Sequence, residues 1–256
     1  MTSTGASVSV RDLRFAYPGG RDCAPAVLDG VSFEITAGER VAVLGPNGAG
    51  KTTLMLQLNG ILSPSSGEVA IGGTTLARDT LREIRRRVGL VFQDPDDQLF
   101  MPTVGEDVAF GPSNFGVRGA ELQARVTSAL VRVGLADAAS RPPQHLSLGQ
   151  RRRAAIATIL SMDVDVVVLD EPTSNLDPSA RRELSATLDA LPATVIVVTH
   201  DLPYALELCP RALVLDGGRI VADGPTRELL ADAAFMAAHG LELPWGFDPL
   251  RTPDPR

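Results

Sequence analysis

The chain has 256 residues, of which 44% are hydrophobic and 21% are charged, and its formal net charge is −7. This length and apolar content fit one α/β domain with a substantial core and an inserted helical lobe. The acidic balance argues against a general binder of polyanions.

The sequence pattern predicts strands first, then a mainly helical region, and then further strands. Short alternating strands are expected over residues 8–35, the phosphate loop described below and further strands over residues 40–93, and mainly helices over residues 94–163. The clearest helix is residues 121–133, because its apolar residues recur on one face. From residue 164 the buried strands of a parallel core resume: 164–169, 194–198 and 212–215, the last followed by a Gly217-Gly218 turn into 219–222.

Two boundaries follow from this reading. Residues 1–240 are expected to form one domain, with the helical part at about 94–163 inserted into it, and residues 179–190 to form a helix capped near Pro178. The proline-rich residues 241–256 are expected to be an extended or disordered tail, which Trp245 and Phe247 pin to the body.

No stretch of the sequence predicts a membrane span. The longest apolar stretch, around residues 154–169, is interrupted by Asp163 and Asp165, and the first ten residues contain no secretory apolar region. Any membrane attachment is therefore expected to come through protein partners.

Residues 45–52, GPNGAGKT, follow the apolar strand RVAVL and precede a helical stretch. Such a loop wraps backbone N–H groups around phosphate at a helix N-terminus. A chance match in a glycine-rich surface loop would lack these flanks. We therefore expect a nucleoside triphosphate here, with Lys51 on the β- and γ-phosphates, Thr52 on Mg²⁺, and contacts from Gly45, Pro46, Asn47, Gly48, Ala49, Gly50, Lys51, Thr52 and Thr53.

Residues 166–171, VVVLDE, read as a strand that is buried on both faces and ends in two carboxylates. Parallel sheets bind ligands at the carboxyl ends of their strands. We expect Asp170 near Mg²⁺ and Glu171 polarising the water that attacks the γ-phosphate. The alternative is a core strand that ends in a solvated acidic pair.

The segment LSLGQRRRAAIA, residues 146–157, completes a set of motifs in a fixed order. With them the chain resembles the ATP-binding subunit of an ABC transporter, from about Val8 to Leu230. The resemblance implies a P-loop NTPase of the ABC type. Its fold is α/β, with a mostly parallel central sheet, antiparallel strands near the N-terminus and an inserted helical subdomain.

The resemblance also implies roles for residues that carry little signal alone. Tyr17 matches the aromatic that stacks on adenine, Gln93 the glutamine that senses Mg²⁺ and the attacking water, and His200 the switch histidine at the γ-phosphate. Alone, these would read as a packing tyrosine, a strand-end amide and an ordinary histidine. Four further residues match the motifs that complete the nucleotide site of the opposite subunit: Ser147, Gly149, Gln150 and, in the D-loop, Asp177.

One residue departs from the family pattern. The commonest signature is LSGGQ, and position 148 here is Leu. Ser147 and the Gly149 amide still offer donors to a γ-phosphate. Activity is expected to survive, and only the backbone freedom at position 148 is in question.

The segment after Gln93 points to a subfamily. It has acidic residues and then an apolar patch at residues 99–101, followed by a helical pattern with Val104, Val108 and Phe110. The patch would cap the sheet or, as an exposed apolar groove rimmed by charge, take a helix of a membrane partner. The segment QDPDDQLF…TVGEDVAFGP resembles the corresponding segment in ATPases of the energy-coupling-factor importers, particularly the cobalt and nickel transport ATPases.

Two further features carry less weight. The arginine runs 85–87 and 151–153 are expected to be solvated helix faces rather than a nucleic-acid surface. Cys23 and Cys209 lack metal-site spacing and fit free thiols in a reducing cytoplasm.

The expected function is therefore an ATPase that uses ATP and Mg²⁺ as a homodimer or as a heterodimer with a second ABC ATPase. It would sit peripherally on the cytoplasmic face of the cell membrane, with a transmembrane coupling subunit and a substrate-capture subunit, and import cobalt, nickel or a vitamin. No nucleic acid is expected as a partner. The alternative is a soluble ABC ATPase that acts on nucleic acid or on protein assembly.

Overall fold

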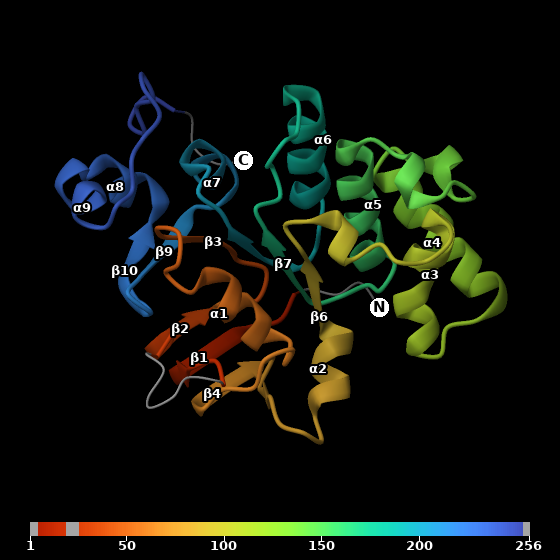
Figure 1. Ribbon diagram of the computed structural model, residues 1–256, viewed down its shortest axis with the longest axis horizontal. Helices are drawn as coiled ribbons and strands as arrows, with labels where there is room; N and C mark the ends of the chain where they lie inside the picture. Colours follow the sequence, from red (N-terminus) through yellow and green to blue (C-terminus); the bar gives the residue numbers. More distant parts are fainter. Residues whose placement is uncertain (1–4, 19–25, 253–256) are drawn as a thin grey trace.

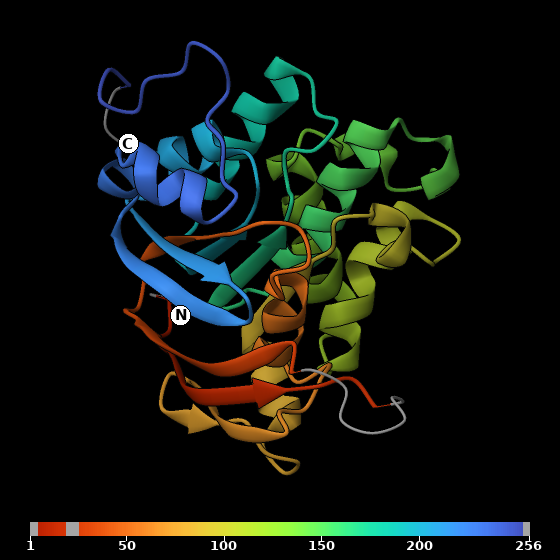
Figure 2. The ribbon, with the colours of Figure 1, turned by 60° about the vertical axis from the view of Figure 1, so that its left-hand side comes forward.

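A computed structural model describes residues 5–18 and 26–252. The strands of this part form two sheets in separate layers (Figures 1 and 2). The smaller, antiparallel sheet has the order β2-β1-β4-β5: Leu28–Ile35, Val8–Phe15, Ser66–Ile71 and Thr74–Thr75. The central sheet has the order β10-β9-β3-β8-β7-β6: Arg219–Pro225, Arg211–Asp216, Arg40–Leu44, Thr194–Val198, Val166–Asp170 and Val88–Val91.

The central sheet is parallel except at its β10 edge. β9, β3, β8, β7 and β6 pair in parallel, and β10 pairs antiparallel with β9. The five residues of β7 and the five of β8 are all buried, as expected for strands that helices or a second layer cover on both faces. The predicted fold class is confirmed: a mostly parallel central sheet with antiparallel strands near the N-terminus.

Helix α1 (Lys51–Leu58) fills the space between the two sheets. Its residues Leu54, Met55 and Leu58 belong to one buried cluster with apolar residues of both sheets. Because α1 follows β3 directly through the loop 45–50, this packing fixes the start of the helix at the carboxyl edge of the central sheet.

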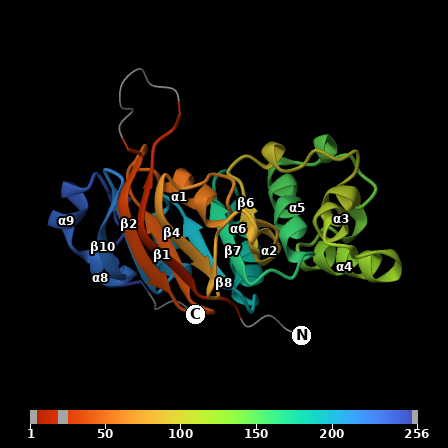
Figure 3. The same cartoon turned by 90° about the horizontal axis from the view of Figure 1, so that it is seen from below.

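A group of three longer helices lies to one side of the central sheet: α3 (Val104–Asn114), α4 (Gly119–Arg132) and α5 (Leu148–Leu160) (Figures 1 and 3). Helix α4 buries Val126, Ala129 and Leu130, which the predicted apolar face of residues 121–133 contains. Three 3₁₀ turns connect this group to its surroundings: Pro95–Asp97, Ala136–Ala138 and Pro143–His145. The predicted helical insertion is therefore present.

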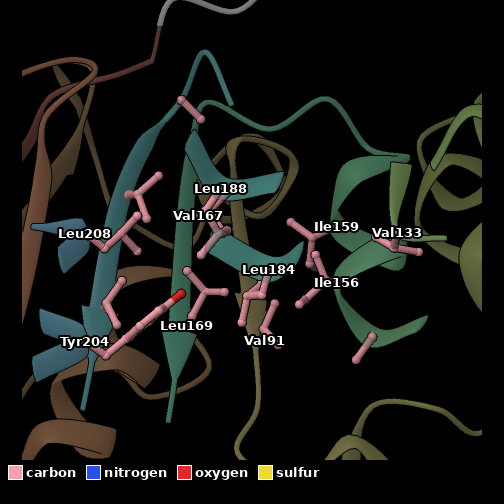
Figure 4. Packing of buried hydrophobic residues seen from close by; sticks show 14 of the residues in the cluster. Val91, Val133, Ile156, Ile159, Val167, Leu169, Leu184, Leu188, Tyr204 and Leu208 are labelled. Carbon is pink, nitrogen blue, oxygen red and sulfur yellow. The ribbon is translucent and has the colours of Figure 1, made fainter. Parts of the chain in front are cut away.

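Two helices, α6 (Pro178–Asp189) and α7 (Leu202–Leu208), pack with α5 in a second buried cluster, separate from the one that contains α1. Figure 4 shows Ile156 and Ile159 of α5 beside Leu184 of α6, with Val167 and Leu169 of β7 between α6 and α7. This cluster ties the signature helix, α5, to the strand that carries the acidic pair.

The remaining helices lie at the periphery. α2 (Leu81–Arg87) precedes β6, and α8 (Thr226–Ala231) and α9 (Ala233–Ala238) lie beside β9 and β10, far from α3 and α4 (Figures 1 and 3). Residues 241–252 contain no helix or strand, as predicted. Phe247 packs against the core, but Trp245 is 101% exposed, so the prediction that Trp245 pins the tail is wrong.

Some other expectations also need correction. Arg152 is only 3% exposed, so the run 151–153 is not a solvated face throughout. Leu99 is buried, so it is not part of an exposed patch. Cys209 is a buried free thiol whose pKa is raised by burial, and Cys23 lies outside the described residues. Within the described ranges, every helix is too short or too polar to cross a bilayer.

Candidate functional site

The phosphate loop joins β3 to α1 and has a backbone that only glycine accommodates at key points. Gly48 and Gly50 have φ values of 81° and 102°. At Gly45, with φ 149°, an added Cβ would lie 2.0 Å from the Leu215 carbonyl oxygen. These positions therefore exclude side chains and leave the loop open to close approach by a ligand.

Lys51, the first residue of α1, folds its side chain back over this loop. Its Nζ donates to the carbonyls of Gly45 at 2.7 Å and Pro46 at 2.9 Å. Burial lowers the pKa of Lys51, and the nearby Glu171 and Asp170 oppose that shift. A buried ammonium aimed across the loop is suited to phosphate oxygens, which offer it more negative charge than two carbonyls.

Thr52 lies next to the carboxylate at the end of β7. Its Oγ1 donates to Oδ2 of Asp170 at 2.9 Å. Asp170 is 4% exposed, and burial raises its pKa while the Thr52 hydrogen bond lowers it. Two hard oxygen donors at the mouth of the loop fit Mg²⁺, which is commonly held by one or two carboxylates and substrate phosphates. Accordingly, the described residues contain no cage of three or more His, Cys, Asp or Glu side chains.

Glu171 follows β7 in a left-handed conformation, with φ 46°. Its carboxylate is held by the residues after β8: Thr199 Oγ1 donates to Oε2 at 3.0 Å, and the His200 amide donates to Oε1 at 2.9 Å. The His200 Nδ1 lies 2.6 Å from the same Oε1. Thr199 was not among the predicted site residues, although a hydroxyl between an apolar strand and His200 is the signal that points to it.

A cavity of about 420 Å³ opens between the phosphate loop and the ends of β7 and β8. It brings together most of the residues that the sequence predicted in the loop and the acidic strand, together with Gln93 and His200. Its lining consists of Val27, Asn47, Gly48, Gly50, Lys51, Thr52, Thr53, Gln93, Asp170, Glu171 and His200. Of these, Val27 was not predicted, because a single apolar residue has no distinguishing signal.

Three loop residues support the cavity without lining it. Gly45 packs on Leu215, the Pro46 carbonyl accepts from Lys51, and Ala49 is buried. Tyr17 also lies outside the lining. Its hydroxyl is 3.1 Å from Thr53 Oγ1, and its half-exposed ring meets Phe15 edge-on.

A second cavity of about 500 Å³ adjoins the first and shares Thr52, Gln93 and Asp170 with it. Its remaining lining comes from the loop after β6, the start of α5 and the segment after Glu171: Phe92, Asp94, Pro95, Asp97, Leu148, Arg152, Ser174 and Asn175. The signature helix therefore reaches the edge of the first cavity, which is called the nucleotide cavity below because the phosphate loop lines it.

The signature residues form the N-terminus of α5. Ser147 and Gln150 make a capping box, in which the Gln150 amide donates to Ser147 Oγ at 3.2 Å and the Ser147 amide donates to Gln150 Oε1 at 2.9 Å. Leu148 is the first helical residue and has no positive φ, so position 148 does not require glycine. Gly149 is the second, and Ser147, Gly149 and Gln150 lie outside the nucleotide cavity.

Asp177 is the N-cap of α6. Its carboxylate accepts from the amides of Ser179 at 2.8 Å and Ala180 at 2.9 Å, and these bonds lower its pKa. It too lies outside the nucleotide cavity. The structure therefore separates the predicted residues into a group around one cavity and a group on an exposed edge.

Comparison with known proteins supports the assignment of this geometry to a family. The sequence profile of the ABC transporter family matches residues 28–174. A Streptomyces coelicolor protein, provisionally assigned as an ABC transporter ATP-binding protein, is 62% identical over 95% of this chain and 92% of its own length. The energy-coupling factor transporter ATP-binding protein EcfA of Carboxydothermus hydrogenoformans is 48% identical over 93% and 87%, respectively.

Solved structures agree. The Clostridium perfringens protein cbiO1, described as part of the ABC transporter complex cbiONQ, aligns with a TM-score of 0.76 and 36% identity, over 93% of this chain and 95% of that one. A dimeric ATP-binding cassette bound to ADP and Pi aligns with a TM-score of 0.77 and 31% identity, over 86% and 98%. The chain thus belongs to the ABC transporter family, as an ATP-hydrolysing ATP-binding subunit of the energy-coupling-factor type.

Proposed function

We propose that this chain binds ATP with Mg²⁺ and hydrolyses it as a dimer, with a second copy of itself or with a related ATPase, to drive a membrane importer. The observation that carries the proposal is the grouping of Lys51, Asp170 and Glu171 around one cavity at the carboxyl edge of the central sheet. Phosphoryl transfer depends on positioning and electrostatics, and this group combines a phosphate-binding cation with two carboxylates.

Each side chain at the cavity takes one part of the reaction. The loop amides and Lys51 bind the β- and γ-phosphates, and Glu171 orients the attacking water. Gln93 and His200 contact that water and the γ-phosphate. Tyr17, whose hydroxyl lies 3.1 Å from Thr53 Oγ1 in the first turn of α1, stacks on the adenine ring. Thr52, Asp170 and Gln93 would hold Mg²⁺, which would neutralise charge on the phosphates.

The exposed signature edge serves the other subunit. Ser147, Gly149 and Gln150 present the N-terminus of a 13-residue helix, where the helix dipole favours an anion. Asp177 lies at the start of α6, also outside the cavity of its own subunit. Two copies that face one another would each supply this edge to the partner's γ-phosphate.

The membrane partner docks on the segment after Gln93. Phe100 is 62% exposed and Phe110 is 41% exposed, and their rings meet edge-on with centroids 4.9 Å apart. Asp96 and Asp97 are exposed nearby in sequence. An exposed apolar pair with acidic residues beside it fits an amphipathic helix that combines apolar and basic side chains.

A buried carboxylate binds the backbone of this surface. Asp107 is 3% exposed, and its Oδ1 accepts from the amides of Phe100 and Met101, both at 3.0 Å. Helix α3 therefore fixes the backbone that presents Phe100. This contact makes the docking surface a preformed feature of the subunit.

The complete transporter adds subunits that this chain lacks. A transmembrane coupling subunit would hold the chain peripherally at the cytoplasmic face of the cell membrane, and a separate capture subunit would select cobalt, nickel or a vitamin. In this proposal residues 1–240 form the ATPase domain, residues 94–163 its inserted docking part, and residues 241–256 a short tail.

The experiment that tests the proposal is affinity purification of the tagged chain from detergent-solubilised membranes of its own host, followed by ATPase assay of the purified assembly. We expect integral membrane proteins in stoichiometric amounts and ATPase activity that the Glu171→Gln variant lacks. Recovery from the soluble fraction with nucleic acid or a protein assembly, and without membrane subunits, would instead support a soluble ABC ATPase.

A further inference from the structure

Arg152 is a buried arginine that binds backbone rather than carboxylate. It lies on α5, five residues after Ser147, and is 3% exposed. Its Nη2 donates to the Gln93 carbonyl at 2.7 Å, and its Nη1 donates to the carbonyls of Pro172, at 3.4 Å, and Ser174. Across residues 5–18 and 26–252, it forms no ion pair within 4.0 Å.

The carbonyls that Arg152 binds belong to the two segments that carry Gln93 and Glu171. Glu171 and Asn175, which flank Pro172 and Ser174, both have left-handed backbones, with φ values of 46° and 60°. Non-glycine residues keep such a conformation only where surrounding contacts hold it. Hydrogen bonds from a guanidinium are charge-assisted and its five donors have fixed directions, so one side chain can hold several carbonyls in one arrangement.

Burying this guanidinium costs desolvation free energy. Desolvation lowers the pKa of Arg152, and Asp94 and Glu171 only partly oppose that shift through their charges. Apolar residues of similar volume often replace buried charges without loss of stability. The contacts with two catalytic segments offer a reason for a charge at this position.

We propose that Arg152 is a positioning residue that connects the signature helix to Gln93 and Glu171 of the same subunit. When the signature edge closes on the partner's γ-phosphate, α5 moves as a unit, and Arg152 fixes the carbonyls of Gln93, Pro172 and Ser174 with it. Nucleotide bound at one site thereby sets the water-orienting residues of the other. The inference rests on the dimer of the proposed function.

The test compares full-length Arg152→Gln, Arg152→Lys and wild type for kcat, KM, the Hill coefficient for ATP and equilibrium ATP binding. For Arg152→Gln we expect kcat to fall about tenfold or more and the Hill coefficient to approach one, with the dissociation constant for ATP within about twofold. The hydrogen bonds of this side chain go to the carbonyls of Gln93, Pro172 and Ser174 and not to the phosphate loop, so ATP binding should be spared. Arg152→Lys keeps the positive charge but loses the fixed arrangement of guanidinium N–H donors, so its kcat should lie between those of wild type and Arg152→Gln.

Arg153→Gln is the matched control. Arg153 is the next residue of the same helix and donates to the Val133 carbonyl and to Glu183, both at 3.1 Å and away from the nucleotide cavity. We expect its kcat to stay within about twofold of wild type. Ser147→Ala provides a coupling test. In the double variant with Arg152→Gln, the fold-loss of kcat should be smaller than the product of the losses in the two single variants.

The outcomes separate the two ideas. The dimer, and this inference with it, would be overturned by two results together. These are a wild-type specific activity that does not change with protein concentration and a normal kcat for Ser147→Ala. If the dimer holds, wild-type kcat and cooperativity in Arg152→Gln overturn the positioning role alone. The positioning role is also overturned if the loss of kcat is matched by an equal loss in the fraction of protein that binds ATP. Should Arg152→Gln fail to fold, Arg152→Lys decides: reduced kcat with normal ATP binding supports the role, and wild-type kcat overturns it.

Discussion

Nδ1 of His200 lies 2.6 Å from Oε1 of Glu171, and the amide of His200 donates to the same oxygen at 2.9 Å. The other carboxylate oxygen, Oε2, accepts from Thr199. Both carboxylate oxygens of Glu171 are therefore engaged by the residues after β8. A change in the position of His200, which is exposed, would free one of them without moving β7.

Replacing Glu171 by Gln should stop hydrolysis and preserve ATP binding. The amide keeps the shape of the side chain but cannot accept a proton from water, and general bases contribute about 10²- to 10⁴-fold in rate. Size-exclusion chromatography with Mg²⁺-ATP should show a stable dimer where wild type is mainly a monomer. Hydrolysis by the variant at the wild-type rate would contradict the assigned role.

Replacing Thr199 by Val should lower kcat about threefold to tenfold, because the carboxylate of Glu171 loses one of its donors and is held less firmly. The substitution changes the hydroxyl to a methyl group inside a buried site. Steady-state ATPase assays at saturating ATP measure the effect. Thr127→Val, on an exposed position of α4, is the control and should leave kcat unchanged. Equal rates for both variants would remove Thr199 from the site.

Replacing Phe100 by Ala should weaken attachment to the membrane partner by about 2 kcal/mol or more, the usual cost of losing an interface aromatic. The free energy of unfolding should fall by only about 1 kcal/mol, because the side chain is exposed and loses mainly its contact with Phe110. A buried phenylalanine would cost about 3 to 5 kcal/mol.

Thermal melting and a membrane pull-down separate these effects. Val131→Ala is the matched control, since Val131 is a large apolar residue on α4 that is 57% exposed. It should keep both the melting temperature and the pull-down. A large drop in the melting temperature of Phe100→Ala, with normal pull-down of the folded protein, would rule out docking at this residue.

Asp107 should make the stability of the isolated chain depend on pH. Burial raises the pKa of this carboxyl above its ordinary 3.8, despite the opposing hydrogen bonds from Met101 and Phe100. The folded chain thus binds this proton more tightly than the unfolded chain. The associated stability is complete below the unfolded value and is lost as pH rises through the raised one.

The variant Asp107→Asn carries a neutral group at every pH and keeps an acceptor for the two amides. It should therefore melt at or above the wild-type temperature at pH 7, and the difference should shrink as pH falls toward about 4. Asp137→Asn, on the exposed surface, should show no such trend. A melting difference between Asp107→Asn and wild type that grows on acidification would contradict the argument.

Replacing Leu148 by Gly, which creates the commonest signature, should not raise activity. Position 148 is the first residue of α5 and has a helical backbone, so it gains nothing from the freedom of glycine. Glycine costs up to about 1 kcal/mol in a helix. We expect kcat within about twofold of wild type and a slightly lower melting temperature. A several-fold rise in kcat would show that Leu148 restrains the signature.

The phosphate loop and the signature cap are features that the sequence itself determines. Glycines at positions 45, 48 and 50 specify a loop that few other residues permit, and Ser147 with Gln150, three positions later, specifies where a helix begins. The apolar run of β7 likewise predicts a strand that is buried on both faces. The capping box joins residues close together in the chain, and the positive φ of Gly48 is a local requirement, whereas Gly45 is also required by the distant Leu215 carbonyl.

The contacts of the Glu171 carboxylate could be found only in the tertiary structure. Glu171 meets Thr199 and His200 across 28 and 29 residues, and Arg152 meets the Gln93 carbonyl across 59. The spacing of an arginine run gives no sign of which member is buried, and an exposed patch cannot be told from its sequence, as Leu99 and Trp245 show. Such contacts depend on the parallel order of β6, β7 and β8, which hydrogen bonds between distant strands impose and no local pattern encodes.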